Sequence, residues 1–114
     1  MEFDSNKPIY LQICDSVCEK VLAGQLKAED RIPSVREYGA QIGVNPNTIS
    51  RSYEKLTDLG IIYTKRGMGY FVTEDARENV IRNEREKFLK EEVPAFIRKM
   101  KLLEINPNEI FNEK

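Results

Sequence analysis

The chain has 114 residues and a formal net charge of −1; 40% of its residues are hydrophobic and 32% are charged. This composition is typical of a small globular protein, and the length suits about one domain of 100–150 residues with an appendage. Residues 1–7 lack the apolar core of a secretion signal, and no apolar run approaches the roughly 20 residues that span a bilayer. We therefore expect a cytoplasmic protein with no membrane partner.

Catalytic and metal-binding chemistry find little support in the sequence. There is no histidine, and the two cysteines, Cys14 and Cys18, lie on one predicted helix. A zinc site needs about four ligands, and no glycine loop lies between a strand and a helix as phosphate binding requires. We expect no enzyme activity, no metal and no cofactor. Cys14 and Cys18 are expected as small core residues, with a redox-sensing pair as the alternative.

The first predicted helix begins near Pro8, because proline suits a first helical turn. Apolar residues recur along it every four positions and predict a buried stripe. This stripe is formed by Ile9, Ile13, Val17 and Val21. Gly24 ends the helix, residues 25–31 form a connection, and Ile32 is expected to join a short strand.

Two short helices around a tight turn follow. Residues 34–37 (Ser-Val-Arg-Glu) fit a capping box, and Gly43 ends this second helix in the left-handed conformation. Asn45 is a good N-cap, and Pro46 fits the first position of a third helix that runs to about residue 59. This layout predicts a helix-turn-helix.

A β-hairpin comes next. Residues 61–64 and 70–73 are β-rich, and Lys-Arg-Gly-Met-Gly at 65–69 lies between them. Three helices followed by a hairpin with a basic tip predict a winged helix-turn-helix, which we place at residues 1–73. The expected fold is mostly α with a small β-hairpin wing.

Residues 74–114 are predicted as a short α-helical dimerisation tail. Pro94 should kink its helix or begin a new one, and Asn106 begins a last short helix. The apolar stripe exceeds what a tail of about forty residues can bury on itself, so we expect it to form a homodimer interface. The predicted interface residues are Val80, Ile81, Phe88, Leu89, Phe96, Ile97 and Met100. The alternative is that the stripe packs on its own winged-helix domain.

The third predicted helix carries most of the candidate DNA contacts. Its first turns present amide, hydroxyl and guanidinium groups opposite the apolar residues Tyr53 and Leu56, and such groups suit base edges and phosphates. The candidates from this helix and its cap are Asn45, Pro46, Asn47, Thr48, Ser50 and Arg51. Ser34 and Arg36 join them from the start of the second helix. The alternatives are helix capping for the polar residues and surface ion pairs for the arginines.

The wing supplies a second group of candidates. Residues 31–70 hold six basic and three acidic residues, an excess that the acids elsewhere conceal. Lys65 and Arg66 place two positive charges at the hairpin tip, and Gly67 and Gly69 allow close approach of a partner. We expect the tip to enter the minor groove or follow its phosphate edge, with a solvated turn as the alternative.

Six stretches of this chain, in order and at matching spacing, resemble the GntR family of bacterial transcription regulators. They are residues 8–13, 32–37, 42–48, 53–56, 60–62 and 65–72. The resemblance implies DNA contacts at Arg36, at residues 45–48, at Ser50 and Arg51 and at the wing glycines. Pro46 replaces the arginine of many relatives, so its base contact is absent, and Glu29 replaces a usual turn glycine. The short tail is similar to that of the YtrA branch, which implies dimerisation through two or three helices.

We therefore predict a transcription regulator, most often a repressor in this branch, that binds a palindromic operator in double-stranded DNA as a homodimer, because a lone winged helix reads only a short half-site. The alternative is a winged-helix module for protein assembly without DNA binding. Whether a small-molecule effector binds, and at which operator the protein acts, stay open at this stage.

Overall fold

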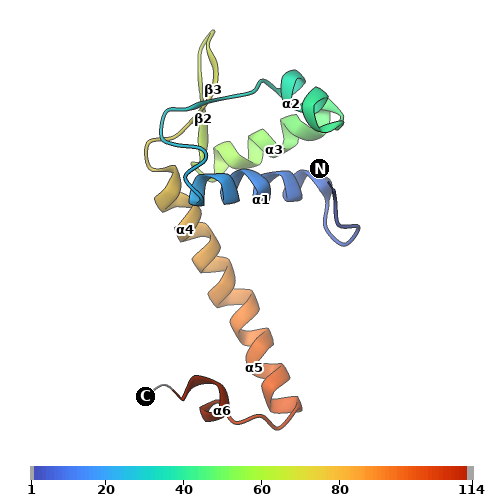
Figure 1. The fold of residues 1–114 in the computed structure, drawn as a ribbon, viewed down its shortest axis with the longest axis vertical. Helices are drawn as coiled ribbons and strands as arrows, with labels where there is room; N and C mark the ends of the chain where they lie inside the picture. Colours follow the sequence, from blue (N-terminus) through green and yellow to red (C-terminus); the bar gives the residue numbers. More distant parts are fainter. Residues whose placement is uncertain (1, 113–114) are drawn as a thin grey trace. The chain divides into compact units, whose positions relative to one another are not determined.

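The computed structural model describes residues 2–112 and divides the chain into two compact units, Met1–Ile81 and Arg82–Lys114. The first unit contains a helix-turn-helix and a small sheet (Figure 1). Its elements are α1 (Ile9–Leu22), β1 (Arg31–Ile32), α2 (Val35–Ile42), α3 (Pro46–Asp58), β2 (Ile62–Lys65) and β3 (Gly69–Val72). The predicted fold class, mostly α with a β-hairpin wing, is confirmed.

The turn between α2 and α3 follows the predicted local chemistry. Ser34 and Glu37 form the complete capping box at the start of α2, and Gly43 ends that helix with φ of 69°, in the left-handed region. The Asn45 side chain accepts a hydrogen bond from the Asn47 amide, and Pro46 occupies the first turn of α3. These caps fix where both helices begin and end, and α2 packs directly against α3.

The sheet has three antiparallel strands in the order β1-β3-β2. Ile32 pairs with Tyr70, so the two-residue strand β1 covers the edge of β3 that β2 leaves open. On the other side Tyr63 pairs with Phe71 and Lys65 with Gly69. The expectation that Ile32 joins a strand is confirmed, and its pairing ties the segment before α2 to the wing.

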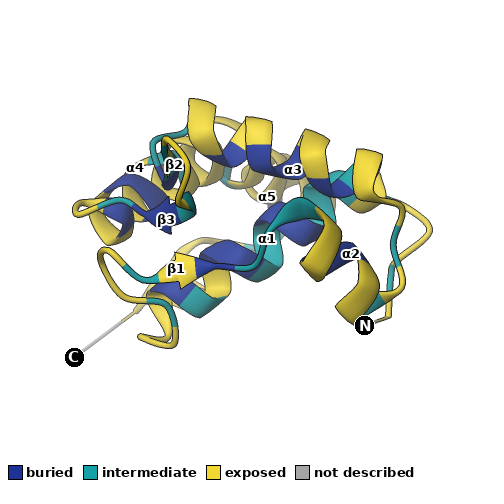
Figure 2. Ribbon diagram, turned by 90° about the horizontal axis from the view of Figure 1, so that it is seen from above, coloured by how far each residue is buried: buried dark blue, intermediate teal, exposed yellow. Residues whose placement is uncertain are grey.

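The core of the first unit lies where α1, α3 and the sheet meet, as the buried faces in Figure 2 show. Its fully enclosed residues come from each of these elements. They include Ile13, Ile49, Tyr53, Leu56, Ile61, Ile62 and Val72. The hydroxyl of Tyr53 donates to the Pro33 carbonyl at 2.8 Å, and burial raises the pKa of this phenol. Tyr53 is therefore a core residue whose hydroxyl joins α3 to the segment before α2.

The cysteines belong to the same core. Both side chains are buried, and the Cys14 thiol donates to the Ser52 carbonyl at 3.4 Å. Burial raises the pKa of Cys14 to about 11, so the thiol is the dominant form at neutral pH, which disfavours redox chemistry. The expectation of small core residues therefore describes Cys14 and Cys18 better than a redox pair does.

The first unit extends beyond the predicted domain end at residue 73. In α4 (Ala76–Lys87), Ala76, Asn79 and Val80 are buried, and Asn79 Nδ2 donates to the Gly60 carbonyl at 2.7 Å. Arg77 Nη1 also donates to the Leu22 carbonyl at 3.0 Å. The start of α4 is therefore part of the winged-helix unit. Val80, predicted at the dimer interface, lies fully inside this core.

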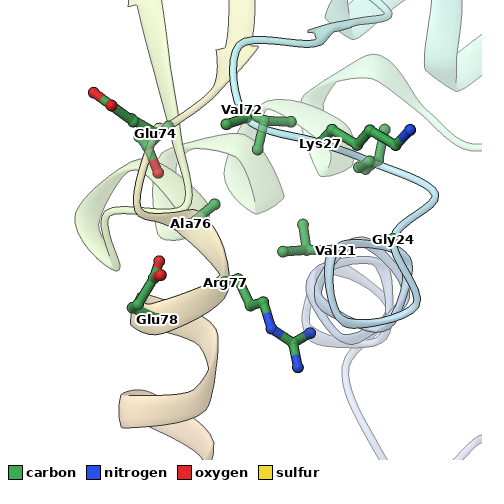
Figure 3. Close-up of a pocket in the computed structure, with 11 residues that line it drawn as sticks. Val21, Gly24, Lys27, Val72, Glu74, Ala76, Arg77 and Glu78 are labelled. Atoms are coloured by element: carbon green, nitrogen blue, oxygen red, sulfur yellow. The ribbon is translucent and has the colours of Figure 1, made fainter.

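A shallow pocket of about 320 Å³ marks the junction of α1 and α4 within the first unit (Figure 3). Val21, Val72 and Ala76 form its apolar floor, while Lys27 and Glu74 stand at its edge. None of the predicted DNA contacts lines it. The pocket reflects the way α4 docks on the end of α1.

The second unit contains a π-helical turn, η1 (Phe88–Glu92), then α5 (Val93–Leu102) and α6 (Asn108–Phe111). The wider π turn ends just before Pro94, which has no amide proton and whose ring would clash with the carbonyl of Lys90 in a regular helix. Pro94 was expected to kink its helix or begin a new one; in the structure a π turn precedes it and Pro94 lies in the first turn of α5. At α6, Asn106 Oδ1 accepts from the Asn108 amide at 2.9 Å, as its capping role predicts.

Most apolar side chains of the second unit stay exposed. The exposed set comprises Phe88, Leu89, Phe96, Ile97, Leu102, Leu103, Ile110 and Phe111, whereas Met100 is buried. Phe96 and Phe111 lie with ring centroids 6.4 Å apart, because α6 folds back toward α5. A groove of about 990 Å³ is lined by residues of η1, α5 and α6, among them Phe88, Phe96 and Phe111.

None of the helices in the described part of the chain is long and apolar enough to cross a membrane. Within residues 2–112, no group of three or more cysteine, aspartate and glutamate side chains is arranged to hold a metal ion.

Candidate nucleic-acid interface

The solvent-facing side of α3 presents the predicted base-reading groups. Asn47, Ser50 and Arg51 are exposed, whereas Ile49 and Ser52 between and beside them are fully buried. Thr48 is half-buried. Helical periodicity therefore separates a core side from a polar side, and the polar side carries an amide, a hydroxyl and a guanidinium within two turns.

Asn45 and Pro46, predicted as DNA contacts, also form the start of α3. The Asn45 side-chain oxygen accepts from the Asn47 amide at 2.8 Å, so this oxygen is committed to the helix start. Pro46 is exposed beside it and has no polar side-chain atom. Asn45 therefore caps α3 through its side-chain oxygen, and its predicted DNA contact stays a prediction, while the side chain of Asn47 lies outside the cap.

At the start of α2, Ser34 is part of the helix cap, whereas the side chain of Arg36 is exposed. The Ser34 hydroxyl accepts from the Glu37 amide, and the Glu37 carboxylate accepts from the Ser34 amide, each at 3.1 Å. The hydrogen bond from the Ser34 backbone is the main cause that holds the pKa of Glu37 below its usual value. Arg36 is exposed, and no ion pair joins it to a carboxylate of the described residues.

Arg51 rests on an aromatic ring that the sequence pattern did not connect with it. Its guanidinium carbon lies 3.9 Å from the centroid of the Tyr10 ring, which comes from the first turn of α1. Within residues 2–112, no ion pair involves Arg51. The surface ion pairs that were the alternative for Arg36 and Arg51 are therefore not formed within the described chain.

The wing lysine, Lys65, lies at the last strand pair before the hairpin turn, and its side chain contacts Phe71 and Glu29. Lys65 Nζ lies 4.4 Å from the centroid of the Phe71 ring and 3.4 Å from a carboxylate oxygen of Glu29. The Tyr63 hydroxyl donates to the same carboxylate, and this hydrogen bond is the main cause of the lowered pKa of Glu29. Glu29 therefore neutralises part of the charge that the wing was expected to offer.

Glu29 occupies the turn position where relatives usually have a glycine. Its φ is 69°, in the left-handed region that residues with a side chain rarely adopt. The backbone conformation expected of a glycine is thus kept, and the hydrogen bond from Tyr63 and the ion pair with Lys65 hold the side chain in place. Compared with a loop that has glycine at this position, the loop before β1 carries one additional negative charge.

The tip of the wing presents Arg66 and two glycines. Arg66 is exposed, and Gly67 and Gly69 have φ of 76° and 106°. Arg31 crosses from β1 and donates from Nε to the Met68 carbonyl at 3.1 Å, and a Cβ at Gly69 would lie 3.5 Å from the same Nε. Arg31 is a residue of the wing that we did not predict, although the pairing of Ile32 with a strand would have pointed to it.

This constellation is that of a DNA-binding winged helix-turn-helix regulator: a proline-started second helix of the motif with a polar outer face, and a glycine-rich hairpin beside it. Residues 9–72 match the family model for "Bacterial regulatory proteins, gntR family". The chain belongs to the GntR family of transcription regulators, and it is not an enzyme.

The relatives cover both units to different extents. The HTH-type transcriptional regulator YhcF of Bacillus subtilis is 39% identical over 109 residues, which span 96% of this chain and 88% of that protein. The HTH-type transcriptional repressor YtrA of the same organism is 43% identical over 77 residues, 68% of this chain and 59% of that protein. The predicted resemblance to the GntR family and its short YtrA-like branch is confirmed.

Solved structures agree with this assignment. A GntR-family regulator from Bacteroides thetaiotaomicron superposes with a TM-score of 0.78 at 48% identity, covering 90% of this chain and 88% of that one. The DNA-binding domain of AraR, in complex with its operator ORR3, has a TM-score of 0.56 at 29% identity and covers 64% of this chain and 86% of that one. The AraR complex is one in which a domain similar to the first unit is bound to operator DNA.

Proposed function

We propose that this protein is a sequence-specific repressor that binds a palindromic operator as a homodimer in the bacterial cytoplasm, with one winged helix on each half-site. The observation that carries this proposal is the set of exposed arginines from α2, α3 and the wing. Arg36, Arg51 and Arg66 form no ion pair within residues 2–112, although the chain as a whole is slightly acidic. Unpaired guanidinium groups on an exposed surface suit phosphates and guanine edges.

Each element has a distinct part in this mode of binding. The polar side of α3 enters the major groove, where the Asn47 amide and the Arg51 guanidinium have complementary base-edge partners. Arg36 supports it from α2 at the phosphate backbone or at a neighbouring base. The wing places Arg66 and the backbone around Gly67 at the minor groove. Pro46 contributes no base contact, so the operator differs from those of relatives with arginine at this position.

A second copy of the chain supplies the other half-site. Phe88, Leu89, Phe96 and Ile97 are about half exposed in the second unit, and large exposed apolar patches mark interaction surfaces. We place the dimer interface on these residues and on Ile81, which is also exposed. Val80 is buried in the core of the first unit and Met100 is buried in the second unit, so both side chains are covered within the chain itself. Repression is supported by the name of the YtrA relative.

Selection from a random-sequence duplex library tests the DNA-binding part. We expect the wild-type protein to enrich a sequence with two inverted half-sites, and its affinity for that duplex to fall steeply with salt because phosphate contacts release counterions. A winged helix that serves protein assembly would enrich no sequence and would show little dependence on salt. Either of these results would contradict the proposal.

Sedimentation velocity tests the dimer. Replacing Phe88 and Leu89 together by glutamine should yield monomers that bind a single half-site as the wild type does but lose affinity for the full palindrome. The matched control is Glu91→Gln, an exposed neighbour in the same π turn that carries no apolar surface. If the double variant still sediments as a dimer, the interface lies elsewhere.

A further inference from the structure

The contact between Arg51 and Tyr10 joins two segments that lie far apart in the sequence. The guanidinium carbon lies 3.9 Å above the centroid of the Tyr10 ring, within the range of a cation–π contact. Arg51 is exposed, while Tyr10 is half-buried. The ring therefore has one face available to the arginine at the surface of the unit.

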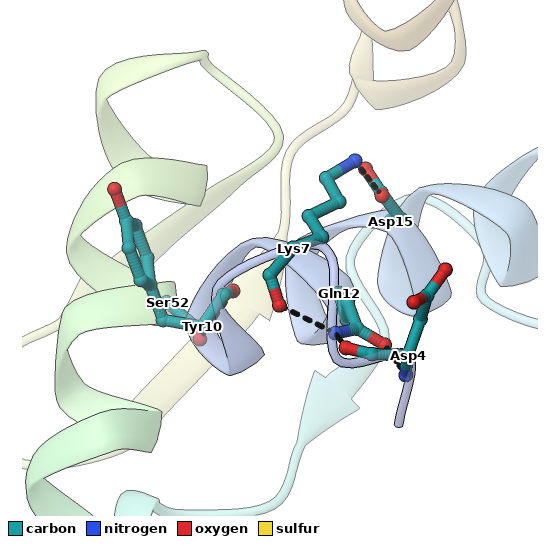
Figure 4. Close-up of polar contacts among 6 residues, drawn as sticks. All are labelled: Asp4, Lys7, Tyr10, Gln12, Asp15 and Ser52. Atoms are coloured by element: carbon teal, nitrogen blue, oxygen red, sulfur yellow. Dashed lines mark hydrogen bonds and ion pairs between the residues drawn. The ribbon is translucent and has the colours of Figure 1, made fainter. Parts of the chain in front are cut away.

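A hydrogen bond from a buried residue of α3 fixes the Tyr10 backbone against that helix. The hydroxyl of Ser52, which is fully buried, donates to the Tyr10 carbonyl at 2.8 Å. The Ser52 carbonyl in turn accepts from the Cys14 thiol at 3.4 Å. Figure 4 shows Ser52 and Tyr10 side by side. Arg51 directly precedes Ser52 in α3, so Ser52 anchors α1 while its neighbour Arg51 lies over the Tyr10 ring.

The segment before α1 is held as well. The Gln12 side chain donates from Nε2 to the Lys7 carbonyl at 2.7 Å, and Lys7 forms an ion pair with Asp15 (Figure 4). These contacts turn the chain that enters α1 back along the same helix. The first turn of α1 thus has a defined position beside the start of α3, where a recognition surface needs rigidity.

A shallow hollow of about 320 Å³ lies between these two helix starts. It is lined by Pro8, Ile9, Tyr10, Asn47, Thr48 and Arg51. Three of these residues are candidate DNA contacts, and the other three belong to the entry of α1. The hollow therefore places the entry of α1 next to the polar face of α3.

We propose that Tyr10 is a positioning residue of the DNA interface, whose ring holds the Arg51 guanidinium in its binding orientation. This inference rests on the proposed function. An exposed arginine loses much rotamer freedom when it binds, and a guanidinium already stacked on a ring has less to lose. A cation–π contact restrains the guanidinium without engaging its N–H donors in an ion pair, so these donors are left for the duplex.

A double-mutant cycle tests this role on the palindromic duplex that the wild-type protein selects from a random library. Tyr10→Leu removes the aromatic face and keeps apolar bulk, and we expect it to weaken binding about two- to fivefold. Tyr10→Phe keeps the ring and should bind as the wild type does. In an Arg51→Met background, Tyr10→Leu should cause no further loss. Thermal unfolding of each variant checks that the fold is retained.

The outcomes separate the failure of this inference from the failure of the proposed function. If Tyr10→Phe loses as much affinity as Tyr10→Leu, the hydroxyl and not the ring contributes, and the positioning role is wrong. The same conclusion follows if Tyr10→Leu is equally harmful with and without Arg51, or harmless while Arg51→Met weakens binding. If Arg51→Met leaves affinity unchanged, Arg51 itself is absent from the interface.

Discussion

The helical part of the proposed DNA interface and its wing part use positive charge in different ways. We define the helical face as Arg36, Asn47, Ser50 and Arg51, and the wing face as Lys65, Arg66, Gly67 and Gly69. On the helical face both arginines are exposed and form no ion pair within residues 2–112. On the wing face the ammonium group of Lys65 lies 3.4 Å from the Glu29 carboxylate.

The difference shows that counting basic residues overstates what the wing offers. A guanidinium stacked on an aromatic ring keeps its N–H donors, whereas an ammonium beside a carboxylate has its charge offset before any DNA arrives. Lys65 therefore helps to join the hairpin to the loop that carries Glu29, and Arg66 is left as the cationic side chain at the tip that has no ion pair within residues 2–112. We expect the helical face to contribute more affinity and more sequence discrimination.

The largest expected effect is that of Arg36→Ala. Loss of a guanidinium that contacts a guanine edge or a phosphate should weaken operator binding by about tenfold or more. The fold should be unaffected, because Arg36 is exposed and alanine is a good helix former. Gln41→Ala is the matched control, since Gln41 is an exposed, uncharged residue of the same helix. Equal affinities of the two variants in fluorescence anisotropy would remove Arg36 from the helical face.

An intermediate effect is expected at the wing, where neighbouring residues allow a direct comparison. Arg66→Ala should weaken binding severalfold and about equally on specific and nonspecific duplexes, lowering the salt dependence by about one counterion. Lys65→Ala should cost less, because its charge is already offset by Glu29. A loss from Lys65→Ala equal to or larger than that from Arg66→Ala would contradict the difference drawn between the two residues.

Most of the helical face could be predicted because its signals are local. A capping box, a left-handed glycine and a cap followed by proline each act within a few residues, and together they fix the start of α3 and hence its outer face. Because Ile49 and Tyr53 face the core, the opposite side of α3 must face the solvent. The same local signals, helix caps and turn glycines, predicted the winged helix-turn-helix fold, and the structure confirms it.

The contacts that distinguish the two faces are not local, and the sequence pattern could not supply them. Tyr10 meets Arg51, and Glu29 meets Lys65, only after the chain has folded. Val80 presents the same problem, since its helical spacing is identical for a residue buried in its own unit and one offered to a partner. Periodicity shows which side of a helix is apolar, but not what covers that side.

The smallest expected effect sharpens the comparison by restoring charge to the wing. Glu29→Gln removes the negative charge beside Lys65, while the amide oxygen can still accept the hydrogen bond from Tyr63. Glutamine also leaves the backbone strain at φ of 69° about as it was, which glycine would not. We expect operator affinity to rise about twofold at low salt, with the gain lost at high salt because exposed charges are screened.

A gain from Glu29→Gln has two physical sources, and controls separate them. Glu19→Gln removes one negative charge from an exposed position on α1, so it reports the effect of net charge alone. Combining Glu29→Gln with Lys65→Ala reports whether the gain passes through the released lysine. If Glu29 offsets Lys65 as the 3.4 Å ion pair indicates, Glu29→Gln should exceed Glu19→Gln, and most of its advantage should vanish when Lys65 is absent. Equal gains from Glu29→Gln and Glu19→Gln would mean that the wing lysine contributes to binding without regard to its carboxylate neighbour.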